Sequence, residues 1–343
     1  MKKTLIALAA LASTAAFAQS NVTLFGNMDL SVANVKQGNQ SLTSMARDGI
    51  STSAWGLRGT EDLGGGLKAG FHVESTIISD TGGAGSTTVA GQLFDRRSIV
   101  TLGGSWGEVR LGRDYVPTFW SHLQYNPFGV FGVGAGNATY STLGSGSTTT
   151  VRADNLITYQ SPSFSGFAVD AAFSLKESKA ANTANEYSGI RVTYNQGPLS
   201  VAVATGSEGS IDLTQSHKRT NIGAAYDFGV AKAFFLHVDS KFGQLKQKQT
   251  TLGVAAPVGP GTLKLAYVRA DENAAAGNDD ANHWAIGYVY PMSKRTSVYG
   301  TYARISNKNG ANFSVAGTTS ATAAAVTAGG TSSGFQAGIR HSF

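Results

Sequence analysis

The sequence is poor in residues on which several classes of protein depend. Its 343 residues include no cysteine and only 7 prolines, and 14% of them are charged, whereas an average soluble domain carries about 25% charged residues. The lack of cysteine excludes a disulfide scaffold. After the N-terminus no apolar run reaches the roughly 20 residues that a transmembrane helix needs, which excludes a membrane protein built from helices.

Glycine and aromatic residues are abundant instead. The chain has 43 Gly, 17 Phe, 12 Tyr and 4 Trp, and its mean hydropathy is −0.08 because uncharged polar residues replace the missing charges. So many aromatic side chains are unusual in a disordered chain. The composition therefore indicates a large, glycine-rich β protein.

The first residues have the pattern of a secretory signal. Met1-Lys2-Lys3 is a basic start, Thr4 to Ala12 is apolar, and Ala16-Phe17-Ala18 fits the cleavage pattern. We expect residues 1–18 to be removed and residues 19–343 to form a single domain. A permanent transmembrane anchor is the alternative, which the shortness of the apolar run disfavours.

Apolar and polar residues alternate along most of the remaining chain. Val22, Leu24 and Val32 share one parity, whereas Thr23 and Asp29 share the other. A period of two is typical of a strand with two different faces. The same alternation recurs in residues 67–76, 167–176, 190–195, 251–256 and 283–290.

The connections between these strands alternate in length. Seven are short and rich in turn formers: Glu61–Gly66, Gly103–Gly107, Ser161–Gly166, Asn195–Pro198, Asp227–Gly229, Pro257–Gly261 and Pro291–Lys294. Eight are longer and polar: Gln37–Gly49, Asp80–Gly91, Pro117–Thr150, Glu177–Glu186, Ser207–Ser216, Lys241–Lys246, Asp271–Asp280 and Ser306–Ser333. We therefore predict an all-β fold, a 16-stranded antiparallel transmembrane β-barrel with short periplasmic turns and longer outer loops. Closure would leave no strand edge unpaired in lipid.

The predicted barrel explains why glycines and aromatic residues are abundant. Glycines on the lumen side, such as Gly223 and Gly287, would permit close backbone approach. Aromatic residues near strand ends suit the girdles at the two membrane interfaces; these are Phe164, Phe228, Tyr290 and Phe343. The aromatic core of a soluble barrel is the alternative.

Five motifs are spread over the chain: Val22–Gly26, Gly59–Leu67, Gly107–Arg113, Arg152–Pro162 and the C-terminal Gly338–Phe343. On these motifs the sequence resembles the general porins of β-proteobacteria over essentially all of residues 19–343. The C-terminal motif is similar to the terminal-Phe strand that such porins use as an assembly signal. The resemblance implies a homotrimeric, water-filled channel in the outer membrane, in contact with lipid and lipopolysaccharide. It also implies that the third long loop folds inward and narrows the pore.

The candidate constriction loop, residues 117–150, contains no Asp, Glu, Lys or Arg. We assign Pro117, Phe128, Gly129 and Gly132 to it. In porins this loop often supplies carboxylates that face arginines of the barrel wall, and here the carboxylate half is missing. The nearest acidic residue is Asp114, just before the loop.

The arginine half is partly present. Arg97 and Arg152 occupy positions that resemble the wall arginines of the family, and which of Arg96 and Arg97 faces the lumen stays open. Two further arginines, Arg58 and Arg110, lie on the lumen parity. Because low-dielectric walls focus the field of fixed charges, such a cluster would attract anions.

Two observations weigh against a strong effect of these arginines. Each of them could instead pair with a wall carboxylate, such as Glu74, Glu108 or Asp170. In addition, Ala54 stands where anion-selective relatives often carry an arginine. The pore could therefore be wider or less selective than theirs.

Other signals carry less weight. Gly132-x-Gly134-x-Gly136 lacks the helix and acidic partner of a dinucleotide site, and the six His residues show no metal-ligand spacing, so we expect no cofactor and no metal centre. Divalent cations at the acidic residues 271–272 and 279–280 stay an open alternative. Without Lys2 and Lys3, 25 basic and 21 acidic residues leave a net charge of +4, which is no nucleic-acid footprint.

We therefore predict a porin for passive diffusion of ions and small hydrophilic solutes, weakly to moderately anion-selective. A substrate-specific channel for small anions such as organic acids or phosphate is the alternative. An outer-membrane hydrolase would need a serine and histidine pair, and His341 on the apolar parity has no recognisable nucleophile motif beside it. We expect no enzymatic activity.

Overall fold

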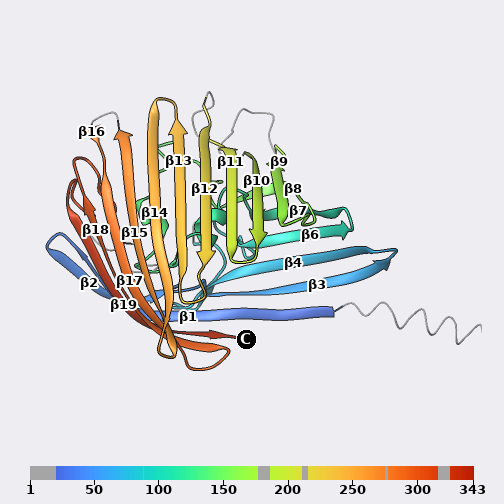
Figure 1. The fold of residues 1–343 in the computed structure, drawn as a ribbon, viewed down its shortest axis with the longest axis horizontal. Helices are drawn as coiled ribbons and strands as arrows, with labels where there is room; N and C mark the ends of the chain where they lie inside the picture. Colours follow the sequence, from blue (N-terminus) through green and yellow to red (C-terminus); the bar gives the residue numbers. More distant parts are fainter. Residues whose placement is uncertain (1–20, 88, 177–185, 211–214, 275–276, 316–324) are drawn as a thin grey trace, which may run out of the picture.

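The computed structural model describes residues 21–87, 89–176, 186–210, 215–274, 277–315 and 325–343. The predicted signal peptide lies outside these ranges. Almost all the regular structure is β (Figure 1). Within the described ranges, no helix is both long and apolar enough to cross a membrane.

The strands follow one another around a closed antiparallel sheet. Their bounds are β1 Asn21–Gln37, β2 Gln40–Arg47, β3 Ala54–Gly64, β4 Leu67–Ile78, β5 Gly83–Ala84, β6 Arg97–Gly104, β7 Gly107–Tyr115, β8 Arg152–Gln160, β9 Phe167–Ser174, β10 Tyr187–Gln196, β11 Leu199–Glu208, β12 His217–Asp227, β13 Lys232–Phe242, β14 Leu245–Val258, β15 Gly261–Ala274, β16 Gly277–Asn278, β17 Ala281–Pro291, β18 Thr296–Asn307 and β19 Thr331–Ser342. Both β2 and β3 pair with β1, as two halves of one interrupted strand. Apart from the two-residue β5 and β16, the barrel thus has sixteen strands, as predicted.

The first and last strands close the barrel. Strand β1 pairs with β19 from Asn27 opposite Ser342 to Gln37 opposite Ser332, and the two lie side by side in Figure 1. Beyond the last strand, Phe343 and Gly26 exchange both backbone hydrogen bonds, at 3.0 and 3.1 Å. The ladder therefore has no free edge along this seam.

The two faces of the strands differ as the alternation predicts. Large apolar side chains on one parity are exposed, among them Val22, Leu24 and Val32, and this parity forms the outward face of the barrel. The opposite parity is buried and largely polar, and in β1 it includes Asp29 and Ser31. The predicted girdle residues Phe164, Phe228, Tyr290 and Phe343 are exposed, as an interfacial position requires.

All seven short connections occur where they are predicted, but three of the predicted long loops are wrong. Strands β1 and β2 are joined by residues 38–39, and strands β13 and β14 by residues 243–244. In the third, Asp271–Asp280, β15 continues to Ala274 and pairs with β16, with Asn273 opposite Asn278. Pairing continues to the turns, with Lys36 opposite Ser41 and Lys241 opposite Lys246. Polar residues of a strand that extends beyond the apolar band have the composition of a loop, which explains the error.

The segment between β7 and β8, residues 116–151, is the longest described connection and holds α2 Trp120–Gln124 and the 3-10 turn η1 Gly136–Thr139. It packs against the buried parity of β10 to β19. A Cβ on Gly223 of β12 would lie 2.1 Å from the Tyr125 ring, and one on Gly287 of β17 would lie 2.9 Å from the Phe128 ring. These contacts give both wall glycines the close approach that the sequence predicts.

Candidate functional site

A cavity of about 630 Å³ lies between segment 116–151 and the opposite wall, which β2, β4, β7 and β8 contribute to. The segment lines it with Phe119, Val130 and Phe131, among other uncharged residues. The wall strands and the connections beside them line it with charged residues of both signs: Arg47, Arg96, Arg113, Arg152, Asp48, Asp95 and Asp154. All the fixed charge of this cavity therefore comes from outside segment 116–151.

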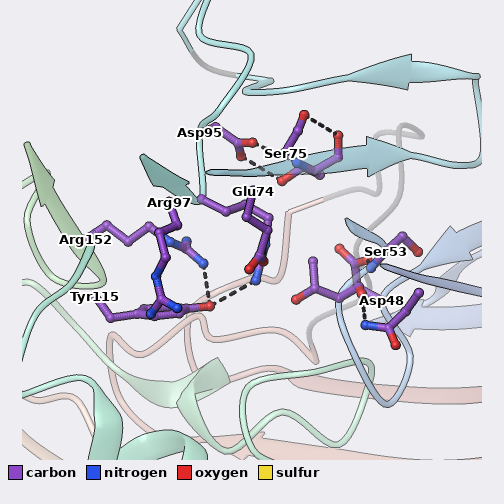
Figure 2. A network of polar contacts seen from close by, with 12 residues as sticks. Asp48, Ser53, Glu74, Ser75, Asp95, Arg97, Tyr115 and Arg152 are labelled. Carbon is purple, nitrogen blue, oxygen red and sulfur yellow. Dashed lines mark hydrogen bonds and ion pairs between the residues drawn. The ribbon is translucent and has the colours of Figure 1, made fainter. Parts of the chain in front are cut away.

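Tyr115, at the end of β7, brings two of the predicted arginines together. Its hydroxyl accepts hydrogen bonds from Arg96, at 2.9 Å, and from Arg152, at 2.5 Å. The Arg152 guanidinium lies over the Tyr115 ring, 4.1 Å from its centre, an arrangement that favours a cation. Figure 2 shows Arg152 against the Tyr115 ring, with Glu74 on the other side of the hydroxyl.

The two arginines differ in their counter-charges. Arg96 forms an ion pair with Glu74, which is one of the pairings that the sequence leaves open. Among the described residues, no carboxylate oxygen lies within 4 Å of the Arg152 guanidinium. Arg152 therefore has no direct ion-pair partner at the cavity, and Glu74 acts on it only from a longer distance.

Arg97 and Arg110 belong to a second group, centred on Asp114. Arg97 contacts the Asp114 carboxylate at 2.7 Å and Arg110 contacts it at 3.5 Å, and Arg110 also pairs with Glu108 at 2.6 Å. The Arg97 guanidinium is still 5.9 Å from the Tyr115 ring. Both Arg96 and Arg97 thus reach the neighbourhood of Tyr115, but only Arg96 lines the cavity.

Arg58 stands apart from this cluster. It is exposed on β3, and its guanidinium lies 5.1 Å from the Phe25 ring centre. Ala54, four residues before it, is buried opposite Thr76. The structure therefore brings four of the five predicted arginines into two adjoining groups and leaves Arg58 outside them.

Arg47 and Arg113 also line the cavity but are not among the predicted arginines. Arg113 lies within a bulge between Gly112 and Asp114, where Gly112 has φ of 130°, and it pairs with Asp154 at 2.7 Å. Because a bulge changes which face a side chain takes, counting parity from Leu111 gives the wrong face. A glycine inside a strand was the available signal.

Segment 116–151 contains no Asp, Glu, Lys or Arg, and its histidine is also uncharged. Its histidine, His122, is buried, and burial together with the nearby Arg219 charge lowers the pKa of the imidazole to about 3. The ring packs between Phe119 and Tyr140, with centroids 6.0 and 5.8 Å away. His122 therefore carries no charge at neutral pH.

A buried charged group fastens both ends of the segment to the wall. Glu208, His217 and Arg219 are each at most 1% exposed; His217 lies 2.8 Å from Glu208, and Arg219 pairs with the same carboxylate. Arg219 also donates hydrogen bonds to the Thr118 hydroxyl, at 3.2 Å, and to the Thr150 carbonyl, at 2.5 Å. Nothing in the sequence pattern pointed to this anchor, because Arg219 is 101 residues from Thr118 and 69 residues from Thr150 along the chain.

The predicted loop residues lie along the rest of the segment. Pro117 is buried beside this anchor. Gly129 and Gly132 adopt positive φ values of 57° and 59°, and Gly132 packs against Gln336 of β19. The Gln336 side chain also accepts a hydrogen bond from the Val133 amide at 2.6 Å. The middle of the segment is thereby attached to the last strand.

Potential metal ligands do not converge in the described part of the chain, where no group of three or more His, Asp or Glu residues could hold an ion. In the acidic loop, Asp279 instead accepts a hydrogen bond from the Gly310 amide at 2.8 Å.

Comparisons with known proteins agree with this architecture. The sequence profile described as Gram-negative porin matches residues 4–310. Outer membrane porin protein 32 of Delftia acidovorans is 40% identical over the whole of both chains. An outer membrane porin protein of Bordetella pertussis is 31% identical, with 89% of this chain and 94% of that protein covered. The solved structure of an anion-selective porin from Comamonas acidovorans is 37% identical, with a TM-score of 0.85 over 95% of this chain and 100% of that one. The chain therefore belongs to the Gram-negative porin family and is a porin of the outer membrane.

Proposed function

We propose that this porin prefers anions, and that Arg152 is the centre of that preference. The observation that carries the proposal is the position of Arg152, which lines the cavity and has no carboxylate within 4 Å among the described residues. The solved relative from Comamonas acidovorans is itself described as anion-selective.

The physical basis is electrostatic focusing and not tight binding. Two unit charges about 4 Å apart interact by ~1 kcal/mol in water and by about 4 kcal/mol near a protein surface. That range concentrates anions beside Arg152 without trapping them. Arginine suits the role because it stays charged at all working pH values.

We further propose that residues 117–150 form the constriction of the pore. Their contacts with Gly223, Gly287 and Gln336 support this, because those residues belong to the buried parity of the wall opposite the arginines. The uncharged segment then offers permeating anions no repulsion.

The test is the reversal potential of the purified porin in a planar bilayer under a KCl gradient. We expect a sign that corresponds to chloride preference. A cation-preferring sign would refute the proposal.

Solute flux separates a general pore from a substrate-specific one. A general pore gives a conductance that rises almost linearly with salt and is not blocked by organic acids or phosphate. Saturating conductance and block at low solute concentration would favour the substrate-specific alternative.

The remaining predictions concern processing, assembly and activity. We propose cleavage after Ala18, and the intact mass of the mature protein tests it. We also propose a homotrimer, which analytical ultracentrifugation in detergent tests.

We also propose contact with lipopolysaccharide and transport without catalysis.

A further inference from the structure

Three lysines form a row across the outward face of three neighbouring strands. Lys218 of β12 is directly opposite Lys241 of β13, which in turn is directly opposite Lys246 of β14. All three are exposed. Side chains that are directly opposite in an antiparallel sheet have Cβ atoms about 5 Å apart, and like charges in that position are destabilising. The row therefore needs a counter-anion.

The described part of the chain does not supply that counter-anion. None of the three lysines forms an ion pair there. The neighbouring Asp239 is opposite Thr220 and Lys248, and its carboxylate lies 3.8 Å from the His237 imidazole. The row is thus a concentrated positive charge on the outside of the barrel.

A surface hollow of about 550 Å³ adjoins two of these lysines. Lys218 and Lys241 line it together with Asp239 and with the hydroxyl-bearing residues Ser188, Ser207, Thr205 and Thr220. Hydroxyl groups both donate and accept hydrogen bonds, and lysine is a point charge suited to phosphate. This combination fits a phosphorylated sugar.

An apolar surface begins on the same face, next to the row. Ile222 follows Lys218 by four residues on β12, roughly 13 Å along the strand, and it is 43% exposed; Leu252 and Tyr267 continue the apolar surface on β14 and β15. The lysine row is on the side of the long connections, which in porins faces the cell exterior. The charge is therefore placed just outside the acyl-chain region of the outer leaflet.

We propose that Lys218, Lys241 and Lys246 bind the phosphate groups of lipopolysaccharide, with its sugar in the hollow and its acyl chains on the adjoining apolar surface. This assigns a site to the lipopolysaccharide contact proposed above and rests on that orientation of the porin. It is independent of ion selectivity, because the row is on the outward face and the cavity is on the inward one.

The test compares the triple variant Lys218→Gln/Lys241→Gln/Lys246→Gln with Lys36→Gln. Lys36 is an exposed outward lysine near the same end of β1, but its strand neighbours are Ser41 and Ser333. Binding of fluorescent lipopolysaccharide to the full-length porin in detergent is measured for each protein. Removing a lysine from an anionic lipid contact costs about fivefold, so we expect the triple variant to bind about 100-fold more weakly and Lys36→Gln to change little.

Three competitors identify the ligand. Unlabelled lipopolysaccharide should displace the probe, whereas its dephosphorylated form, inorganic phosphate and phosphatidylglycerol vesicles should do so only weakly. Equal binding by the wild type and the triple variant would overturn the proposal, and so would equal competition by any of the last three. Reversal potentials of the same proteins should be unchanged, so that failure of the lipid site and failure of anion selectivity give different results.

Discussion

Arg152 differs from its neighbours in what compensates its charge. Arg96, Arg97 and Arg110 each contact a carboxylate, and such a pair presents little net charge to a passing ion. Arg152 is held by the hydroxyl and ring of Tyr115 instead. A neutral partner fixes the geometry of the guanidinium and leaves its field intact.

Replacing Arg152 with Gln should reduce the anion preference. Loss of about 1 kcal/mol of attraction corresponds to a roughly fivefold lower chloride-to-potassium permeability ratio, measured from reversal potentials. The matched control is Arg110→Gln, because Arg110 does not line the cavity and is paired with Glu108. An equal or larger effect of the control variant would contradict the role given to Arg152.

His122 should make stability depend on pH. The folded protein holds the imidazole pKa at about 3, against an ordinary value of 6.5, so the unfolded chain binds the additional proton between these values. The stabilisation from the neutral imidazole is complete above about pH 6.5 and declines by about 1.4 kcal/mol per unit as the pH falls to about 3.

The melting temperature of the porin in detergent, measured from pH 7 to pH 4, tests this expectation. His122→Gln should give a shallower slope than the wild type, because the titrating group is gone. His341→Gln, which removes an exposed imidazole, should leave the slope unchanged. The same slope in all three proteins would exclude the effect.

At the scale of elements, segment 116–151 is positioned by the wall it packs against. Its two ends are bound through Arg219, its middle is bound through Gln336, and its aromatic rings lie on wall glycines. Under the constriction proposed above, the cavity on its other side is what remains of the lumen at this level. Its width therefore depends on how closely the segment approaches β12 and β17.

Gly223→Ala should push the segment toward the arginines. The added Cβ would lie 2.1 Å from the Tyr125 ring, and relief of such overpacking costs roughly 1–3 kcal/mol. We expect a lower single-channel conductance and faster cleavage within the segment by chymotrypsin.

Gly300→Ala is the control for this substitution, since its Cβ would meet no atom nearer than 3.9 Å. Adding Tyr125→Ala to Gly223→Ala should restore the conductance by removing the clash. Unchanged conductance in Gly223→Ala itself would mean that the segment does not limit the current.

At the scale of the whole molecule, Phe343 takes part in closing the barrel. Phe343 pairs with Gly26 through two backbone hydrogen bonds, and its ring covers the Gly26 backbone. An unpaired backbone group in lipid costs several kcal/mol. The C-terminal end of the ladder is thus a point at which closure can fail.

Deletion of Phe343 should strongly reduce the yield of closed barrels. Folded porin is measured as the fraction of unheated protein that migrates as the compact form in gel electrophoresis. Phe164→Ala, at an 81% exposed position in a turn, should fold normally. A wild-type folded fraction in the deletion variant would show that the preceding strand suffices.

Much of the architecture was predictable because one face of every strand meets lipid and the other meets water. That difference produces a period of two in the sequence. Together with the turn-forming residues between the strands, this period led to the correct strand number and to all seven short turns. Loop length was less predictable: Lys241 and Lys246 look like loop residues, yet they pair in a hairpin. Beyond the lipid band, hydropathy no longer separates strand from loop.

The candidate site was predictable only in part. Arg97 and Arg152 were named because they occupy positions that resemble the wall arginines of the family, and Arg96 because it adjoins Arg97. Arg113 was hidden by the bulge at Gly112. The anchor formed by Glu208, His217 and Arg219 was also missed, because its link to Thr118 spans about a hundred residues.

The sequence by itself determined the barrel, its membrane and the charge-free character of residues 117–150, because hydropathy period and composition are local properties. Only the tertiary structure decided which arginine has no carboxylate directly paired with it. Whether an arginine is paired depends on which carboxylates lie within a few ångströms of its guanidinium. The strand register and a single bulge set those distances.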